Sequence, residues 1–459
     1  MVPRTVGQSN ARNFTRLLTK RAVSFSASSR STVESASGDG ELRLFIVAGE
    51  VSGDSIASRV MVSIKKLSPL PVRFAGVGGH MMSKQGLTSV FPMEDIAVMG
   101  IWELLPHLNQ FRLRLEEAVQ AALRFRPHAV LTVDAKGFSF RFLKHLRAKY
   151  RKQQGTLGPL HFHYVAPSFW AWKGGEGRLG GLAEFVDHVL CILPFEAEVC
   201  RSNGLAATFV GHPTLDDMFE FEGRDSTEYG WKVKGNAEKF RSDHGISTGS
   251  KVISLLPGSR LQEVTRMLPI FSDTMNQLQD SFPELVTAIL VAPNSHVENF
   301  ISETTRDWLT SVVLVPGGSP QMKYDSFSGS NVALCTSGTV AMELQLARLP
   351  CVVAYRAHLL TELFIRYKAK VSYISLPNIL LDSAIIPEAL FNDCTPSRLA
   401  TLLRNLVLDE SLRQKQMIGA DKVIGLLKLP ELINGSSTQL IGYTASMVAA
   451  STILFSRRT

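Results

Sequence analysis

The chain has 459 residues, 45% of them apolar and 20% charged, a balance typical of a globular protein with two or three domains. The net charge of +8 does not by itself indicate nucleic-acid binding, because six of the cations precede the first acid, Glu34. The 5 cysteines form no Cys-X-X-Cys pair, which favours reduced thiols in the core.

Residues 1–40 are rich in Arg and Ser, and Phe14 and Leu17 lie among their basic residues. This pattern is typical of an organellar transit peptide, and a disordered basic tail is the alternative. The segment has no continuous apolar run, so it is not a secretory signal. We therefore leave it out of the fold and expect import into the mitochondrion, or alternatively into the chloroplast.

Apolar runs alternate with amphipathic stretches from residue 41 to residue 217. The runs that predict strands are 44–48, 72–77, 129–133, 161–165, 187–192 and 207–210. The stretches that predict helices include 55–67, 103–124 and 138–150. Such alternation predicts an α/β domain with a doubly wound parallel sheet, in which ligands bind beyond the carboxyl ends of the strands.

The segment "AGEVSGD" (48–54) joins the first predicted strand to the first predicted helix. A turn in this place usually holds a phosphate on its backbone N–H groups. Glu50 would repel such an anion, so the ligand of this turn stays open at this point.

Residues 100–119 combine Trp102, Leu105 and Leu108 with Arg112 and Arg114. An apolar stretch with a basic rim suits a membrane surface or an acyl chain. A helix that packs on the core is an equal alternative, because amphipathic helices are common.

Asp134 ends a predicted strand within "LTVDAKGFSFR". A carboxylate at the carboxyl end of a strand is well placed to act as a general base. The alternative is that Asp134 caps the helix that starts near Phe138.

"HYVAPSFWAW" brings Trp170 and Trp172 together after another predicted strand. These aromatic rings could stack on a sugar ring or an acyl chain, or they could belong to the core. His163 is a candidate acid or base, although a lone His beside a strand is more often structural. His212, in "VGHP", ends a further strand near the same edge. No metal is expected, because no Asp, Cys or His partners stand at ligand spacing.

The polar stretch 218–250 predicts a linker with a short helix, and a second alternating series occupies 251–435. Its predicted strands are 251–256, 287–292, 312–315, 331–335 and 350–354, and its predicted helices include 338–347 and 395–407. The fold class is therefore α/β, with two Rossmann-like doubly wound domains facing across a cleft.

The tail 436–459 contains one apolar stretch, 440–455. It is shorter than the ~20 residues that a spanning helix needs, so it predicts a helix packed on the body. A membrane anchor is the alternative.

"LLPGSRLQEV" predicts another turn from strand to helix, built from Gly258, Ser259 and Arg260. Gly258 permits a close backbone approach, and Arg260 offers a planar fork to a phosphate oxygen. An ordinary turn with a surface arginine is the alternative.

"CTSGTVAMEL" predicts a third such turn, in which Ser337, Gly338 and Thr339 stand at a helix N-terminus. Hydroxyls and free amides in that position form an anion site. Glu343, one turn further on, could accept hydrogen bonds from two ribose hydroxyls. Plain N-capping is the alternative. Two phosphate-type turns in one predicted domain favour a nucleotide site.

The motifs of this chain, taken in order, resemble the lipid-A-disaccharide synthase family and cover most of residues 43–400. They are "AGEVSGD", "VMGIWELL", "HYVAPSFWAW", "LPFE", "VGHP", "LLPGSR", "SGTVAMEL" and "VSYISLPNIL". The transit-like N-terminus indicates the organellar form found in plants. The resemblance implies an inverting glycosyltransferase with the two-domain GT-B architecture.

The resemblance also implies the substrates. The family joins UDP-2,3-diacylglucosamine to 2,3-diacylglucosamine 1-phosphate (lipid X) and releases UDP. Its members are peripheral membrane enzymes that need no metal or other cofactor, and no nucleic-acid partner is implied. Bacterial members exchange C-terminal segments in a dimer, so a homodimer is an open expectation here.

Three residue roles follow from the resemblance. Asp134 falls on the proposed general base, Arg260 on the arginine at the UDP phosphates, and Asn378 on an asparagine expected to face the cleft. This chain departs from the family where Lys136-Gly137-Phe138-Ser139 replaces Pro-Asp-Phe-Asn. The rivals of Asp134 as the base are Glu50 and His163.

The acceptor belongs on the N-terminal domain of this architecture, which answers the question raised by "AGEVSGD". Ser52 and the Gly53 amide are expected at the phosphate or hydroxyls of the acceptor. Glu50 is expected to orient an acceptor hydroxyl or to anchor the loop. Trp170 and His212 join them as expected substrate-binding residues.

Two readings from other classes stay open. One is a different GT-B enzyme that resembles UDP-N-acetylglucosamine epimerases, which would turn over an unacylated UDP-sugar. The other is a catalytically inactive lipid-binding scaffold, suggested by the departure at Lys136-Gly137, which would form no lipid product.

Overall fold

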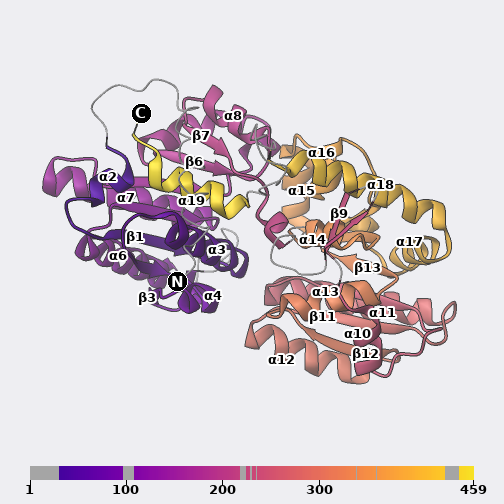
Figure 1. Cartoon of the computed structure of the whole chain (residues 1–459). Coiled ribbons are helices and arrows are strands. Elements are labelled where there is room, and N and C mark those ends of the chain that lie inside the picture. Colours follow the sequence, from indigo (N-terminus) through magenta and orange to yellow (C-terminus); the bar gives the residue numbers. More distant parts are fainter. Residues whose placement is uncertain are drawn as a thin grey trace, which may run out of the picture. The chain divides into compact units, whose positions relative to one another are not determined.

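The computed structural model in Figure 1 describes residues 30–96, 108–217, 224–227, 230–233, 235–336, 339–357, 359–429 and 444–458. The chain divides into two compact units. Unit 1 comprises Met1–Trp170, Gly174–Pro213 and Leu429–Thr459, and unit 2 comprises Ala171–Lys173 and Thr214–Lys428. Residues 1–29 of the predicted transit peptide lie outside the described residues. Residues 30–40 do belong to the fold, contrary to the prediction of a disordered segment up to residue 40, because Thr32–Ala36 is a helix and Ala36 is fully buried in the core of unit 1.

Unit 1 is built on a seven-stranded sheet in the order β3-β2-β1-β4-β5-β6-β7, and neighbouring strands are parallel. The strands are β1 (Leu42–Ala48), β2 (Val72–Val77), β3 (Thr88–Ser89), β4 (Ala129–Val133), β5 (Leu160–Tyr164), β6 (His188–Cys191) and β7 (Ala207–Phe209). The chain runs outward from β1 to β3 and then returns to the other side of β1 with β4. The strand order therefore reverses between β1 and β4, which is where open α/β sheets bind ligands.

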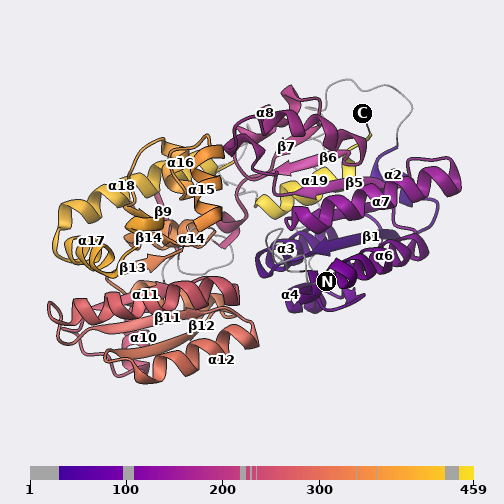
Figure 2. The ribbon, with the colours of Figure 1, turned by 180° about the vertical axis from the view of Figure 1, so that it is seen from behind.

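Helices cover both faces of this sheet, because its central strands carry apolar residues on both sides. Their bounds are α2 (Thr32–Ala36), α3 (Val51–Leu67), α4 (His80–Lys84), α6 (Leu108–Phe125), α7 (Lys136–Gln154), α8 (Glu196–Ser202) and α19 (Ala445–Phe455). In β1, Leu44 and Ile46 pack in the same core as α3 and α19. Phe45 and Val47 pack in the core of α6 and α7, which cover the other face (Figure 2).

The C-terminal helix α19 belongs to unit 1, where it lies beside α3 (Figures 1 and 2). Its residues Ala449, Ala450 and Ile453 are fully buried. Beyond the helix, Arg458 donates hydrogen bonds to Asp187 at 2.9 Å and to the Pro159 carbonyl at 2.7 Å. For 445–455 the packed helix is therefore the correct alternative. None of the helices in the described part of the chain is long and apolar enough to cross a membrane.

Unit 2 contains a six-stranded sheet in the order β12-β11-β10-β13-β14-β15, again with parallel neighbours. The strands are β10 (Val252–Leu256), β11 (Val286–Val291), β12 (Ser311–Pro316), β13 (Val332–Cys335), β14 (Cys351–Tyr355) and β15 (Glu388–Leu390). The helices are α10 (Ala237–Asp243), α11 (Leu261–Gln279), α12 (Ser295–Thr304), α13 (Pro320–Gly329), α14 (Thr339–Ala347), α15 (Leu359–Lys368), α16 (Leu376–Leu381), α17 (Pro396–Leu408) and α18 (Glu410–Leu427). The strand order reverses between β10 and β13, which places a second switch point in unit 2.

The stretch 218–250, predicted as a linker, is part of unit 2 where the structure describes it. It holds an antiparallel pair, β8 (Arg224–Thr227) and β9 (Gly230–Val233), and the expected short helix, α10. Phe240 of α10 is only 4% exposed. Gly235 lies so close to the backbone of Tyr324 that a Cβ atom would come within 2.2 Å of it. These contacts pack the segment on α13. The polar composition of 218–250 gave no sign of this packing.

Candidate active site

The turn between β1 and α3 lies directly against the turn between β4 and α7. A Cβ atom on Gly49 would stand 2.7 Å from the Cβ of Ala135, so only glycine fits there. A Cβ on Gly53 would stand 3.4 Å from the Val133 carbonyl, which packs the start of α3 on the end of β4. The sheet thus brings "AGEVSGD" and Asp134 together at its switch point.

Asp134 and Ala135 both have left-handed backbones, with φ of +48° and +43°. This geometry costs about 1–2 kcal/mol for each L-residue, so the surrounding structure has to hold it. The Asp134 N–H donates to the Tyr164 carbonyl at 3.0 Å, and the Ser139 hydroxyl donates to the Asp134 carbonyl at 2.8 Å. Neither bond uses the carboxylate, which stays available for other work.

Asp134 does not cap α7. The N-cap residue is Ala135, which has no side chain that could accept a hydrogen bond. Among the described residues, none donates a hydrogen bond to the Asp134 carboxylate, and the side chain is half-buried. The capping alternative for Asp134 is therefore wrong. A strained, half-buried carboxylate at the switch point is typical of a functional position.

The acids of "AGEVSGD" have different surroundings. Glu50 is the N-cap residue of α3 but makes no side-chain cap. Asp54, by contrast, is 4% exposed and accepts hydrogen bonds from the N–H groups of Gly79, Met81 and Met82 at 2.9–3.0 Å. Asp54 therefore holds the start of α4 in place. The motif "AGEVSGD" alone did not reveal this role of Asp54.

His163 is a structural residue. It is 1% exposed, its Nδ1 lies 2.8 Å from the Thr132 hydroxyl, and its ring packs 4.7 Å from that of Phe140. Burial, with a smaller effect of the Lys136 charge, lowers the pKa of His163 from 6.5 to about 3. A buried imidazole with so low a pKa is a poor proton acceptor near neutral pH and has no access to solvent, which counts against His163 as the rival of Asp134.

We expect the variant His163→Gln to be less sensitive to acid while it keeps its turnover. An unfolded His163 binds a proton below its ordinary pKa of 6.5, whereas the folded one stays neutral down to about 3. The free energy of unfolding should therefore fall as the pH drops through this window, by about 1.4 kcal/mol per pH unit for this group. His161 and His188 add to the slope, because burial lowers the pKa of His161 to about 3 and that of His188 to about 4.

Urea unfolding at several pH values between about 6.5 and 4.5 measures this slope. The exposed His80 is the matched control, and His80→Gln should leave the slope as it is. A His163→Gln enzyme that folds but has lost most of its turnover would return His163 to the list of candidate bases.

Trp170 is held by Glu196, an acid of the "LPFE" segment to which the sequence assigned no role. Its indole N–H donates to Glu196 at 3.0 Å, and its ring meets that of Phe195 edge-on at 4.9 Å. Glu196 is 3% exposed and also accepts from the Leu193 N–H at 3.1 Å. Burial raises the pKa of Glu196 to about 7 despite these hydrogen bonds. The "LPFE" segment therefore positions Trp170. His212 is fully buried, so its predicted place at the edge of the site is not supported.

The stretch predicted to meet a membrane is described from residue 108 onward, and Trp102 and Leu105 lie outside the described residues. Phe111 is 8% exposed and packs edge-on against Phe138, at 5.3 Å between ring centroids. Arg114 pairs with Asp95 and Glu117, at 2.7 Å in each case. The described part of this stretch is therefore a core-facing helix.

Unit 2 places two helix N-termini at its own switch point. Gly258 has a φ of +122°, and a Cβ there would stand 2.7 Å from Oε2 of Glu263. Arg260 is the N-cap residue of α11 and is 3.2 Å from Glu263. Next to this turn, the Thr336 N–H donates to the Leu256 carbonyl at 3.1 Å, which ties the end of β13 to the end of β10.

The second turn is described only in part. Ser337 and Gly338 lie outside the described residues, and for Thr339 the backbone alone is described, as the first residue of α14. Ser259 is exposed beside Arg260. The two adjacent turns offer backbone N–H groups, helix dipoles and one guanidinium, which together favour a diphosphate.

Glu343 is not free to receive a ribose on both oxygens. Its Oε1 lies 2.9 Å from the Nζ of Lys323, which is 9% exposed. Lys323 in turn stands 3.9 Å from Asp217, and the Tyr324 hydroxyl donates to Asp217 at 2.6 Å. The sequence did not reveal this network, because Asp217, Lys323 and Glu343 are far apart along the chain.

Asn378 is fully buried and its side chain is bonded within its own loop, so the structure gives no support to its expected place facing the cleft. Its amide nitrogen donates to the Ile386 carbonyl at 2.8 Å and to Glu388 at 2.9 Å. Its oxygen accepts from the N–H groups of Ile385 and Ile386, at 3.0 and 2.9 Å. Glu388 also accepts from the Ser375 hydroxyl at 2.6 Å. The "SLPN" segment therefore shapes a loop.

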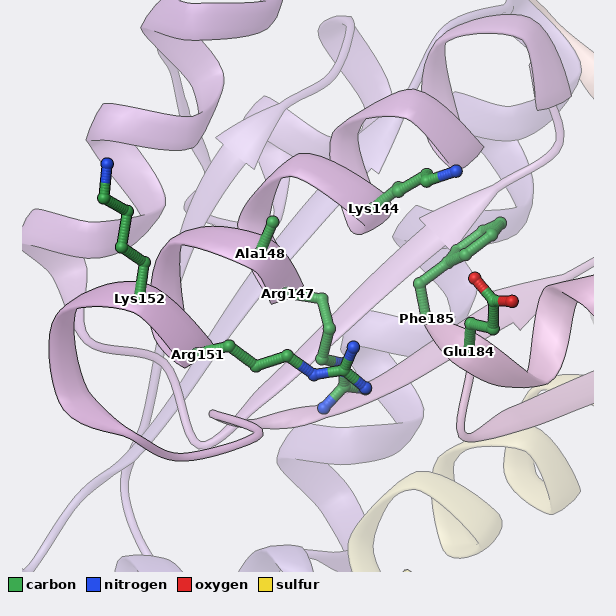
Figure 3. Close-up of a pocket in the computed structure, with 7 residues that line it drawn as sticks. All are labelled: Lys144, Arg147, Ala148, Arg151, Lys152, Glu184 and Phe185. Atoms are coloured by element: carbon green, nitrogen blue, oxygen red, sulfur yellow. The ribbon is translucent and has the colours of Figure 1, made fainter.

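A hollow of about 440 Å³ on unit 1 lies apart from these turns (Figure 3). Its lining residues are Lys144, Arg147, Ala148, Arg151, Lys152, Glu184 and Phe185. The α7 residues among them come from its middle and its C-terminal part, whereas Asp134 precedes its first turn. The hollow therefore lies toward the amino ends of the strands, away from the turns at their carboxyl ends. Among the described residues, no three His, Cys, Asp or Glu side chains group in a way that could hold a metal ion.

Comparison with known proteins gives one consistent result. A family model described as lipid-A-disaccharide synthetase matches residues 44–438. A probable mitochondrial lipid-A-disaccharide synthase of Arabidopsis thaliana is 60% identical over 447 residues, which are 96% of each chain. A lipid-A-disaccharide synthase of Rhodospirillum centenum is 41% identical and covers 83% of this chain and 89% of its own.

Solved structures show the same fold at low identity. A UDP-GlcNAc 2-epimerase from Neisseria meningitidis, solved with UDP-GlcNAc, has a TM-score of 0.56 at 12% identity and covers 84% of this chain and 98% of its own. The glycotransferase of kitacinnamycin has a TM-score of 0.52 at 14% identity and covers 90% and 98%. The predicted class, two parallel α/β domains of the GT-B type, is confirmed by these neighbours and by the two sheets.

Proposed function

Because the chain belongs to the lipid-A-disaccharide synthase family, we propose that it transfers 2,3-diacylglucosamine from UDP to lipid X. The products are the disaccharide 1-phosphate of lipid A synthesis and UDP. The observation that carries this proposal is the 60% identity to the Arabidopsis relative over 96% of both chains. The likeness to UDP-GlcNAc 2-epimerases is one of fold alone, at 12% identity, and does not favour the epimerase alternative.

In this proposal each of the two switch points binds one of the two substrates. The UDP diphosphate binds at the turns after β10 and β13, where the N-termini of α11 and α14 and the Arg260 guanidinium supply positive charge. Gly258 allows the phosphates to approach the backbone. Residues 337–339 complete the site, and the free oxygen of Glu343 bonds to the ribose.

Lipid X binds to unit 1 at the paired turns after β1 and β4. Ser52 and the Gly53 N–H, at the start of α3, bind its phosphate or hydroxyls. Glu50 orients a hydroxyl beside Asp134. Trp170, fixed by Glu196, offers the half-buried face of its ring to the sugar.

The reaction is a single displacement. The Asp134 carboxylate takes the proton from the 6-hydroxyl of the acceptor, and the resulting oxygen forms a bond to the anomeric carbon of the donor. The bond from that carbon to the diphosphate breaks, and UDP leaves with the electron pair. Arg260 and the two helix N-termini stabilise the charge that develops on the diphosphate. The departure at Lys136-Gly137 leaves Asp134 in place, since Tyr164 and Ser139 hold its backbone.

The enzyme works at a membrane surface, because both substrates carry acyl chains. Import into the mitochondrion is part of the proposal and is supported by the Arg-rich residues 1–40 and by the mitochondrial name of the Arabidopsis relative.

Mass spectrometry of lipid products tests the proposed function. The purified chain, mixed with UDP-2,3-diacylglucosamine and lipid X, should form a lipid with the mass of the disaccharide 1-phosphate. It should leave unacylated UDP-N-acetylglucosamine unchanged. An epimerised UDP-sugar has the same mass and is detected by NMR; its formation would support the epimerase alternative. No lipid product together with an unchanged UDP-sugar would support the inactive scaffold.

A further inference from the structure

Helix α15 of unit 2 exposes three large apolar side chains on one face. Leu363 is 57% exposed, Phe364 56% and Tyr367 72%. Residues three and four positions apart lie side by side on a helix, so the three form one cluster. Solvent-exposed side chains of this size seldom gather in a soluble protein unless they meet a partner or a membrane.

Trp172 extends this cluster from a separate segment of unit 2. Its ring lies 5.8 Å from that of Phe364. The segment is fixed to the end of α15 by two backbone hydrogen bonds, from Lys173 N–H to the Lys368 carbonyl at 2.9 Å and from Lys370 N–H to the Ala171 carbonyl at 2.8 Å. We refer to Trp172, Leu363, Phe364 and Tyr367, together with Lys173 and Lys368, as the α15 surface.

The charges of the α15 surface are positive. The Nζ of Lys368 stands 5.4 Å from the centre of the Tyr367 ring, and that of Lys173 stands 5.9 Å from it. The acid within α15 is Glu362, which is 7% exposed and pairs with Arg366 at 2.7 Å. The face therefore combines aromatic rings with lysines and presents no exposed carboxylate from its own helix.

We propose that the α15 surface docks unit 2 on an anionic lipid bilayer. Trp and Tyr favour the boundary between head groups and acyl chains, where the apolar part of the ring is buried and its polar end stays wet. Lysines beside them are attracted by the negative surface of the membrane. A bilayer suits this cluster better than a protein partner does, because the rings and the cations gather on one small surface and need no matching pocket. The proposal rests on the proposed function in one respect: a diacylated donor has to reach unit 2 from a membrane.

Sedimentation with vesicles tests the docking without any substrate. The full chain should bind vesicles of phosphatidylcholine and phosphatidylglycerol more strongly than vesicles of phosphatidylcholine alone. The variant Leu363→Ser/Phe364→Ser/Tyr367→Ser should lower the partition coefficient on anionic vesicles at least tenfold. Lys173→Gln/Lys368→Gln should remove much of the preference for anionic lipid.

The matched control changes three exposed apolar residues elsewhere in unit 2. Leu408, Ile418 and Leu426 are 67%, 50% and 45% exposed, and their joint replacement by Ser should leave vesicle binding as in the wild type. UDP affinity and thermal melting of each variant show whether unit 2 is still folded.

Several results would overturn the proposal. Wild-type protein that does not sediment, or a folded α15 triple variant that sediments like the wild type, would each do so. If vesicle binding is kept but the KM for the diacylated donor rises in detergent, the surface holds donor acyl chains instead. Turnover of both substrates in detergent micelles needs no docking, so a failure of the proposed function would show there independently.

Discussion

The turnover rate of the variant Asp134→Asn should be about 10²–10⁴ times lower than that of the wild type, which is the usual contribution of a general base. The amide keeps the size of the carboxylate but cannot take a proton from the acceptor hydroxyl at working pH. Because Asp134 caps no helix and its backbone is held by Tyr164 and Ser139, the substitution should leave the fold intact. Asparagine also tolerates the left-handed backbone at this position.

Initial rates with both lipid substrates measure the loss, and UDP affinity and thermal melting should stay near the wild-type values. Glu50→Gln is the matched control, because Glu50 belongs to the neighbouring turn. This substitution should lower the turnover rate less than Asp134→Asn does. If Asp134→Asn keeps more than about a tenth of the activity, the base is elsewhere, and Glu50 becomes the leading candidate.

The variant Arg260→Ala should bind UDP about 10–100 times more weakly. A charge-assisted hydrogen bond to phosphate contributes roughly 1.5–3 kcal/mol, which corresponds to that range of affinity. Arg260 begins α11 beside the exposed Ser259, and one of its contacts is with Glu263 at 3.2 Å. A bound diphosphate would compete with Glu263 for the Arg260 guanidinium. The diphosphate is favoured because it also contacts two helix N-termini.

Calorimetry with UDP measures the change directly. The matched control is Arg266→Ala, which removes the same charge from the same helix. Arg266 lies in the second turn of α11 and donates to the Arg356 carbonyl at 3.4 Å. We expect Arg266→Ala to weaken UDP binding much less than Arg260→Ala does. Equal effects of the two substitutions would mean that Arg260 acts through the general field of unit 2 and not through a phosphate contact.

The sequence predicted the sheets well because their central strands are buried on both faces and read as continuous apolar runs. It missed β3 and β15, which have two and three residues, and the β8–β9 pair, which is too short for a period to show. The polar composition of 218–250 suggested a linker, although Phe240 and Gly235 pack that segment on α13.

Within the candidate site, the sequence identified positions that follow strands but not what those positions contact. Asp134 and Arg260 end up at switch points because strand order puts them there. Asn378 has the same polar side chain as a ligand-binding residue, yet it is fully buried and bonded within its own loop. Glu196 holds Trp170, and Lys323 pairs with Glu343, across at least 20 residues of sequence, so no local pattern could reveal these two contacts.

The stereochemistry of the new glycosidic bond tests the central claim most directly. If Asp134 activates the acceptor for one displacement at the anomeric carbon, that carbon must invert. NMR of the isolated disaccharide should show an anomeric configuration opposite to that of the UDP-linked donor. The same configuration in donor and product would contradict the account, because retention requires a different route from the single displacement assigned to Asp134.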